Sequence, residues 1–184
     1  QKGGLEISDS VKIANLIEKE NIDFIEVSGG NFEAPEAYQY VSLKESTKSR
    51  EAYFLDAAKN IKASVSIPIM VTGGFRSISV MEDALTSSST DLIGIGRPFV
   101  IDPSFPYKLL NGDISVLPAV ERNFPPAQDI PKGAVLNWFC DQLALQGKTG
   151  KGDINIPLID GHERYIKQSD EATHSLISFR NDSK

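Results

Sequence analysis

The residues best suited to chemistry are the glycines of two short loops, Thr72-Gly73-Gly74 and Gly94-Ile95-Gly96-Arg97. Each loop follows an apolar run that is typical of a buried parallel strand. Glycine lets the backbone approach an anion closely, so that N–H groups can donate hydrogen bonds to its oxygens. Arg97 adds a planar guanidinium, which can bind the same anion. The two loops together predict a phosphate-binding site.

Other polar residues are weaker candidates for the site. Either loop alone would be explained by a tight turn, and the second loop changes that interpretation because it repeats glycine and adds arginine. A solvated charge at a helix start is the favoured interpretation of Arg76, and loop packing that of Tyr38 and Tyr40. We assign no catalytic residue. Cys140 is the single cysteine and has no second cysteine with which to form a metal-ligand cluster, so we assign no metal ligand either. The two histidines, His162 and His174, lie in the tail.

The elements that must position these loops alternate between helical and strand patterns. Apolar residues at helical spacing predict a helix from Ser8 or Asp9 to about Glu20, a helix at 47–62 and a helix from about Ser77. β-prone runs predict strands at 23–27, 67–71 and 91–95. Residues 31–46, after the first strand, are expected to form a long excursion. This βα alternation predicts a parallel α/β sheet.

The second part of the chain has a different pattern. A short helix should end near Leu110, residues 113–130 show no period, and a helix is expected at 133–145. A flexible basic hinge at 147–152 and a loosely ordered polar tail from Ser169 complete the expectation. The domain organisation is therefore residues 1–112, followed by an extension, residues 113–184, with one or two helices and a polar tail.

Composition narrows the function classes. The chain has 184 residues, of which 40% are hydrophobic and 24% charged, with a formal net charge of -6. This acidic balance argues against a nucleic-acid partner, which requires a basic surface. No apolar run approaches the roughly 20 residues that span a bilayer, so we expect no membrane partner and a cytoplasmic location. Because residue 1 is Gln1 rather than methionine, the chain is expected to begin inside a domain.

The stretch Pro68–Pro103 resembles the end of the barrel in the Old Yellow Enzyme family of NADH:flavin oxidoreductases and NADH oxidases. The segments at 3–5, 23–30 and 49–54 match the same family in order and spacing. The resemblance covers roughly residues 3–112. It implies a partial TIM (β/α)8 barrel, containing strands six to eight with their helices, plus the C-terminal extension.

The resemblance also implies a cofactor and a reaction. FMN would place its phosphate on the loop residues Gly73, Gly74, Gly96 and Arg97, with Phe75 and Ile95 near the isoalloxazine or the phosphate. NAD(P)H would reduce the flavin, and the flavin would pass hydride to an activated alkene, as in ene-reductases. The family's carbonyl-binding and proton-donating residues lie on strand four, which is expected to precede Gln1. The chain alone is therefore expected to be inactive.

Three strands of a barrel leave two unpaired edges that another surface should cover. The candidates are the N-terminal barrel portion, a second copy of the chain, or the segment after residue 113. Two other functions stay open at this point. One is a non-catalytic FMN- or phosphate-binding remnant that acts as an interaction module, and the other is a different barrel enzyme, such as a phosphosugar isomerase.

Overall fold

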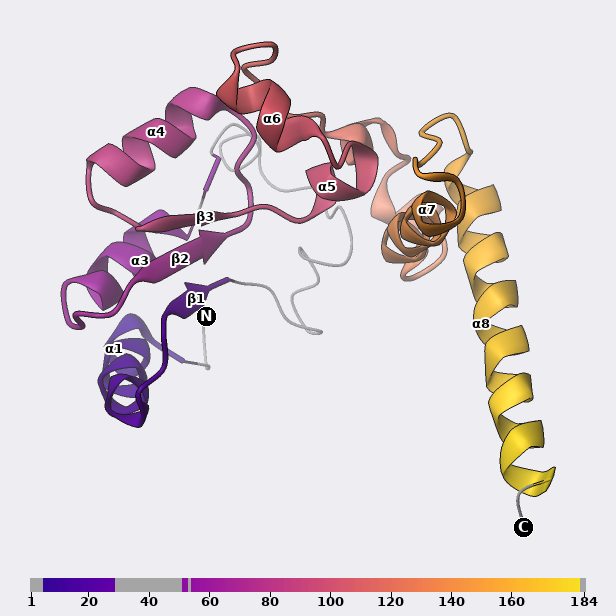
Figure 1. Ribbon diagram of the computed structural model, residues 1–184, viewed down its shortest axis with the longest axis horizontal. Helices are drawn as coiled ribbons and strands as arrows, with labels where there is room; N and C mark the ends of the chain where they lie inside the picture. The colour runs from indigo at the N-terminus through magenta and orange to yellow at the C-terminus, as the bar shows by residue number, and fades with distance from the viewer. Residues whose placement is uncertain (1–4, 29–50, 53, 183–184) are drawn as a thin grey trace. The chain divides into compact units, whose positions relative to one another are not determined.

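The computed structural model describes residues 5–28, 51–52 and 54–182, which form two compact units. The first unit holds the described residues up to Gly96 together with Ser104–Pro118. Its sheet consists of the parallel strands β1 (Ile25–Val27), β2 (Ile69–Thr72) and β3 (Leu92–Gly94), in the order β1-β2-β3 (Figure 1). The predicted parallel α/β sheet is confirmed.

Helices alternate with these strands along the chain. They are α1 (Ile7–Ile17) with the 3-10 turn η1 (Glu18–Glu20), α3 (Leu55–Lys62), α4 (Ile78–Thr86) and α6 (Phe105–Leu110). The core of this unit lies between strands and helices and includes Ala14, Ala58, Ile61, Ile69, Val71, Phe75, Met81, Ala84, Phe105 and Leu109. Residues 31–46, the predicted long excursion, lie outside the described residues.

The large apolar residues of α1 are not on its packed face. Ile13, Leu16 and Ile17 recur at helical spacing, but their exposed fractions are 40%, 62% and 36%. The helix instead buries Ala14, and Glu18 at its end accepts hydrogen bonds from the backbone N–H and hydroxyl of Ser66, both at 2.6 Å. A small residue and a polar contact therefore determine the orientation of α1.

The second unit holds Arg97–Pro103 and the described residues from Ala119 onward. Its elements are α5 (Arg97–Ile101), the 3-10 turns η3 (Val120–Asn123) and η4 (Ala127–Asp129), α7 (Ala134–Thr149) and α8 (Leu158–Asp182). Trp138 is fully buried, and its ring meets those of Phe124 and Phe139 edge-on, with centroids 5.1 Å apart in each pair. This aromatic group is the centre of the second core.

Two expectations for the extension are wrong. The first three residues of the predicted hinge at 147–152 belong to α7, which ends at Thr149. Gly150 caps the helix with a φ of 82°. The predicted loose tail from Ser169 belongs to α8, whose residues 169–180 are exposed all round as it extends past α7 (Figure 1). That segment contains neither glycine nor proline, so its polar residues can continue a helix that packing started upstream. None of the described helices, α8 included, is long and apolar enough to cross a membrane.

Candidate functional site

The two glycine loops leave the same edge of the sheet. Thr72, the last residue of β2, pairs with Gly94, the last residue of β3. Because the strands are parallel, both loops begin at the carboxyl ends of neighbouring strands. The structure therefore brings Gly73 and Gly74 to the edge from which Gly96 also departs, as the sequence predicts.

The first loop requires glycine for its backbone conformation. Gly73 has φ of 120° and Gly74 has φ of 84°, values that residues with a side chain rarely adopt. A Cβ atom on Gly73 would also lie 3.3 Å from Cε2 of Phe54. Both glycines are thus explained by the turn itself.

The second loop begins with a glycine that packing requires. A Cβ atom on Gly94 would lie 1.7 Å from Oγ1 of Thr72 and 2.7 Å from its Cβ. The same Thr72 hydroxyl is buried and has no hydrogen-bond partner among the described residues. The contact between Thr72 and Gly94 cannot be found from the sequence, because the pairing of the two strand ends becomes visible only in the sheet.

Gly96 is different from its neighbours. A Cβ atom built on Gly96 would meet no described atom within 4 Å, and its φ lies outside the left-handed region. Neither the backbone conformation nor the packing of the described residues requires glycine here. A small residue at this position leaves open space beside the backbone N–H groups at the end of β3.

Arg97 has two partners that the sequence analysis did not predict. Its Nη1 lies 3.0 Å from Oε1 of Glu121 in η3, and its guanidinium carbon lies 5.9 Å from the ring centroid of Phe139 in α7. The exposed fraction is 32% for the arginine side chain but only 5% for that of Glu121. Arg97 therefore combines a buried anionic partner with partial access to solvent.

Arg97 also borders an apolar pocket of about 250 Å³ within the second unit. The pocket is lined by Arg97, Val100, Val135, Leu136, Phe139, Cys140 and Leu143. The apolar walls strengthen electrostatic interactions of the guanidinium at the pocket, because they lower the local dielectric.

Phe75, expected near the flavin, has its side chain in the core of the first unit, with an exposed fraction of 1%. The neighbouring Arg76 donates from Nη1 to the carbonyl oxygen of Phe75 at 2.8 Å. Ile95 packs partly buried against the same core. The proximity of Phe75 and Ile95 to a cofactor stays a prediction.

A carboxylate holds the start of α4, the helix that follows the first loop. Glu51 accepts hydrogen bonds from the backbone N–H groups of Arg76 and Ser77, at 2.8 and 2.7 Å, and from the Ser77 hydroxyl at 2.5 Å. Burial raises the pKa of Glu51, but these hydrogen bonds outweigh it and the pKa lies below its ordinary value. Glu51 lies in the stretch 49–54 that resembles the family, but nothing in the sequence indicates this role.

Asp91, the residue before β3, has structural contacts. Its carboxylate forms an ion pair with Lys62 and accepts a hydrogen bond from the backbone N–H of Ile69 at 2.9 Å. The hydrogen bond from Lys62, followed by that from Ile69, lowers the pKa of Asp91. Asp91 thus joins the beginnings of β2 and β3, at the edge opposite to the loops.

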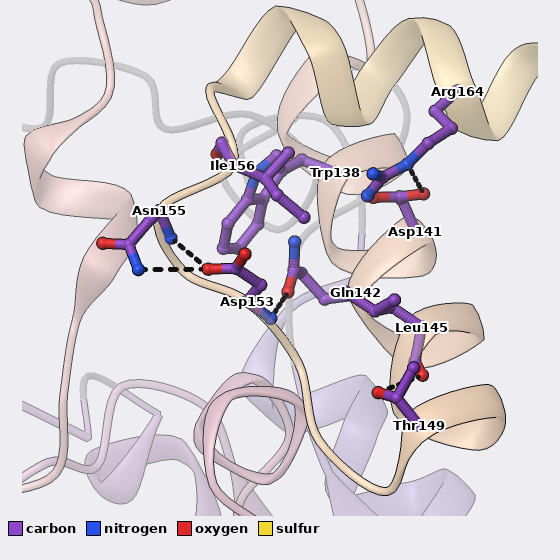
Figure 2. Close-up of polar contacts among 9 residues, drawn as sticks. All are labelled: Trp138, Asp141, Gln142, Leu145, Thr149, Asp153, Asn155, Ile156 and Arg164. Atoms are coloured by element: carbon purple, nitrogen blue, oxygen red, sulfur yellow. Dashed lines mark hydrogen bonds and ion pairs between the residues drawn. The ribbon is translucent and has the colours of Figure 1, made fainter.

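Buried polar residues of the second unit have structural partners (Figure 2). Asp141 accepts from Nε of Arg164 at 2.8 Å, and the Gln142 side-chain oxygen accepts from the backbone N–H of Asp153 at 2.7 Å. His162 lies with Nδ1 at 3.0 Å from Nδ2 of Asn137. No cluster of three potential metal ligands occurs in the described part of the chain. Tyr38 and Tyr40 lie outside it.

Comparison with known proteins defines the class. Residues 2–113 match the model of the NADH:flavin oxidoreductase / NADH oxidase family. The chain belongs to this family. The match contains both glycine loops and Arg97, and it ends before Glu121 and Phe139.

Particular relatives agree with this class. The chain is 39% identical over 110 residues to an NADH-dependent flavin oxidoreductase of Neonectria sp. (strain DH2), an alignment that covers 55% of this chain and 14% of that protein. It is 37% identical over 107 residues to an NADH-dependent flavin oxidoreductase of Talaromyces variabilis, covering 55% of this chain and 25% of that protein. The chain thus spans a quarter or less of these relatives.

One solved structure extends the likeness to the fold. The complex of 2-naphthoyl-CoA reductase with 2-naphthoyl-CoA superposes with a TM-score of 0.53 at 26% identity, covering 64% of this chain and 18% of that chain. This structural likeness agrees with the family match and not with the phosphosugar isomerase interpretation.

Proposed function

We propose that this chain binds the phosphate of FMN on its two glycine loops, as the C-terminal part of a partial TIM barrel in an NAD(P)H-dependent oxidoreductase. The observation that carries the proposal is that both loops leave neighbouring parallel strands at the same edge. Loops at the carboxyl ends of the last two barrel strands frequently form phosphate sites.

The residues present fit a phosphate group. Gly96 leaves open space beside the backbone although neither conformation nor packing requires glycine there. Gly73 and Gly74 would present backbone N–H groups, and Arg97 would add charge-assisted hydrogen bonds to phosphate oxygens. Bound FMN would supply hydride transfer from NAD(P)H to a substrate.

The substrate class proposed is an activated alkene, reduced as in ene-reductases. The support comes from names of similar proteins, which include the 2-naphthoyl-CoA reductase above and a cinnamate reductase of Clostridium sporogenes at 23% identity over 114 residues. The loops described here would hold the cofactor and leave substrate choice to residues elsewhere. Catalysis by the whole protein therefore needs groups beyond these loops.

The phosphate assignment is tested by comparing FMN with riboflavin, which lacks the phosphate. We expect Arg97→Ala in the whole gene product to weaken FMN binding by about tenfold or more, because a hydrogen bond to a charged group contributes roughly 1.5–3 kcal/mol. Riboflavin affinity should stay unchanged. Flavin fluorescence quenching measures both, and Arg122→Ala, at an exposed arginine of η3, is the control. Equal FMN affinity in the Arg97 and Arg122 variants would contradict the assignment.

Turnover separates the oxidoreductase from the non-catalytic alternative. The whole gene product, loaded with FMN, should oxidise NADH or NADPH faster when an enone is added. Tight FMN binding without any such turnover would instead support a cofactor-binding interaction module.

A further inference from the structure

We propose that one face of α8 binds the same face of α8 in a second copy of the chain, with the two helices antiparallel. This face, which we call the outer stripe, consists of Ile159, Glu163, Ile166, Asp170, Thr173, Ile177 and Arg180. It belongs to the second unit and lies beyond residues 2–113, the part of the chain that matches the family model. The pairing goes beyond the proposed function and does not depend on flavin binding.

The outer stripe is separate from the face of α8 that packs on α7. On the packed face, Gly161 lies against the Trp138 ring. His162 lies beside it, with Nδ1 at 3.0 Å from Nδ2 of Asn137, and Leu158 is buried on the same side. With 3.6 residues per turn, the outer stripe is centred roughly 100° around the helix from these residues. All seven of its side chains are exposed, so a second helix can contact the outer stripe while α7 keeps its place.

The spacing of the outer stripe is that of helices that pair side by side. Its members are alternately four and three positions apart, so they stay on one side of the helix along its length. Its isoleucines, Ile159, Ile166 and Ile177, have exposed fractions of 37%, 41% and 52%. Residues 169–180 are exposed all round (Figure 1), and a helical segment of this length is marginal in water without packing. A second helix along the outer stripe would provide that packing.

The charges of the outer stripe select a second copy as the partner, in the antiparallel orientation. Glu163 and Arg180 lie near its two ends, and neither forms an ion pair within the described part of the chain. An antiparallel pair can place Ile166 opposite Ile177 of the second copy. In this register Glu163 lies opposite Arg180 of the second copy, and two-fold symmetry repeats both contacts. A parallel pair would instead place glutamate opposite glutamate and arginine opposite arginine.

Asp170 limits the affinity of this pair. In the same register it lies opposite Thr173 of the second copy, close to the two-fold axis, so the Asp170 side chains of the two copies approach each other. The outer stripe has no basic residue at its centre to compensate these charges. Because exposed ion pairs contribute little each, we expect a dimer that forms in the micromolar range.

Charge reversal tests the register. In the whole gene product, Glu163→Arg alone or Arg180→Glu alone should weaken dimerisation by about tenfold or more, because two attractive pairs become repulsive. An equimolar mixture of the two variants should form mixed dimers with an affinity within about threefold of the original, since each arginine then faces a glutamate. Sedimentation velocity over the micromolar range measures monomer and dimer.

Two further variants separate pairing from damage to the fold. Glu171→Arg is the matched control, because Glu171 is exposed on α8 but lies outside the outer stripe, and it should leave dimerisation unchanged. Asp170→Asn removes the like charges near the two-fold axis and should strengthen the dimer by about threefold. A damaged helix would explain neither this gain nor the restoration by mixing.

Three results would overturn the inference. They are a whole gene product that stays monomeric throughout the micromolar range, a dimer that neither single reversal weakens, and a mixture that associates no better than the single variants. Amide hydrogen exchange of residues 169–180 identifies another occupant, because protection by the proposed pair should rise with protein concentration. Protection in a monomer that is independent of concentration would mean that another segment of the same chain covers the outer stripe.

Discussion

At the scale of single residues, two different needs explain three of the four glycines at the sheet edge. Gly73 and Gly74 have backbone conformations that favour glycine, whereas Gly94 is required by the space that Thr72 occupies. Gly96 meets neither need among the described residues. The four positions should therefore respond differently to the addition of one methyl group.

The contrast between Gly94 and Gly96 gives the first prediction. Gly94→Ala should lower the free energy of unfolding by about 1–3 kcal/mol, because the new methyl group overlaps with Thr72. Gly96→Ala should change it by less than about 0.5 kcal/mol, as is usual at open positions. Urea unfolding followed by circular dichroism measures both.

The same pair of variants separates stability from binding. Gly96→Ala should weaken FMN binding despite a normal unfolding midpoint, because its methyl group enters the space proposed for the phosphate. Destabilisation of equal size in the two variants would disagree with the difference in space that the structure shows.

Glu51 provides a pH-dependent prediction. Its pKa is lowered in the folded protein, so its contribution to stability is present above the unfolded pKa and is lost as the pH falls through the folded pKa. Glu51→Gln should lower the free energy of unfolding by about 1 kcal/mol near neutral pH, through weaker hydrogen bonds to the start of α4.

The pH series identifies the cause. The difference between Glu51→Gln and the original protein should shrink as the pH falls below the ordinary carboxyl pKa and through the lowered pKa of Glu51 in the folded protein. Glu82→Gln, at an exposed glutamate of α4, should show little difference throughout. A difference for Glu51→Gln that is constant with pH would refute the role of its charge.

At the scale of elements, α7 and α8 approach each other through a glycine. Gly161 is buried in α8, and a Cβ atom there would lie 2.5 Å from Cδ1 of Trp138 in α7. On the exposed side of α7, a Cβ atom on Gly147 would meet nothing within 4 Å. The two helical glycines thus have opposite environments.

Alanine should therefore have opposite effects at these positions. Gly147→Ala should stabilise the protein by about 0.5–1 kcal/mol, because alanine has the higher helix propensity. Gly161→Ala should destabilise it by about 1–3 kcal/mol, since the overlap with the indole exceeds that gain. Thermal unfolding followed by Trp138 emission measures the two changes, and stabilisation by both variants would argue against this helix contact.

The elements differ in how well the sequence predicts them. β2 and β3 are predictable because each is a short, mostly apolar run that ends at glycine. β1 is predictable as a β-prone run that ends shortly before Gly29. The buried face of α7 is not, because Leu136 and Leu143 have exposed fractions of 42% and 50% whereas Asp141 and Gln142 are buried. Their burial depends on Arg164 and Asp153, distant partners that no helical period reveals.

The candidate site likewise has parts that the local sequence predicts and parts that depend on distant residues. Local glycine patterns predict the two loops and their common edge. Glu51 binds the start of α4, and Glu121 pairs with Arg97. Both glutamates lie far along the chain from these partners. Only the folded chain brings such pairs together, and an isolated glutamate in the sequence carries no sign of them.

At the scale of the whole molecule, apolar side chains are exposed near both outer strands of the sheet. The exposed fractions are 45% for Phe24 just before β1 and 44% for Leu92 in β3. Leu5 and Leu16, earlier in the chain, reach 63% and 62%. In the described residues, β1 and β3 each pair with β2 on one side. Such surfaces favour association with another chain segment.

This leads to a prediction about association. The 184-residue chain expressed alone should form dimers or larger assemblies at micromolar concentration, because its outer strands and apolar side chains can pair with a second copy. Light scattering after size exclusion measures the mass. Phe24→Lys should reduce the assembled fraction, with Asp23→Lys as a control for added charge, and a monodisperse monomer of the original chain would count against association.

Trp138 is the one tryptophan of the sequence, and it is fully buried in the second unit. The flavin phosphate is proposed to bind at the two glycine loops. Indole emission overlaps with flavin absorption, so resonance energy transfer from Trp138 to a bound flavin would depend on the distance between the indole and the flavin. The chain thus contains its own fluorescence donor, and a bound flavin would be the acceptor. The distance between the two could then be measured without an added dye.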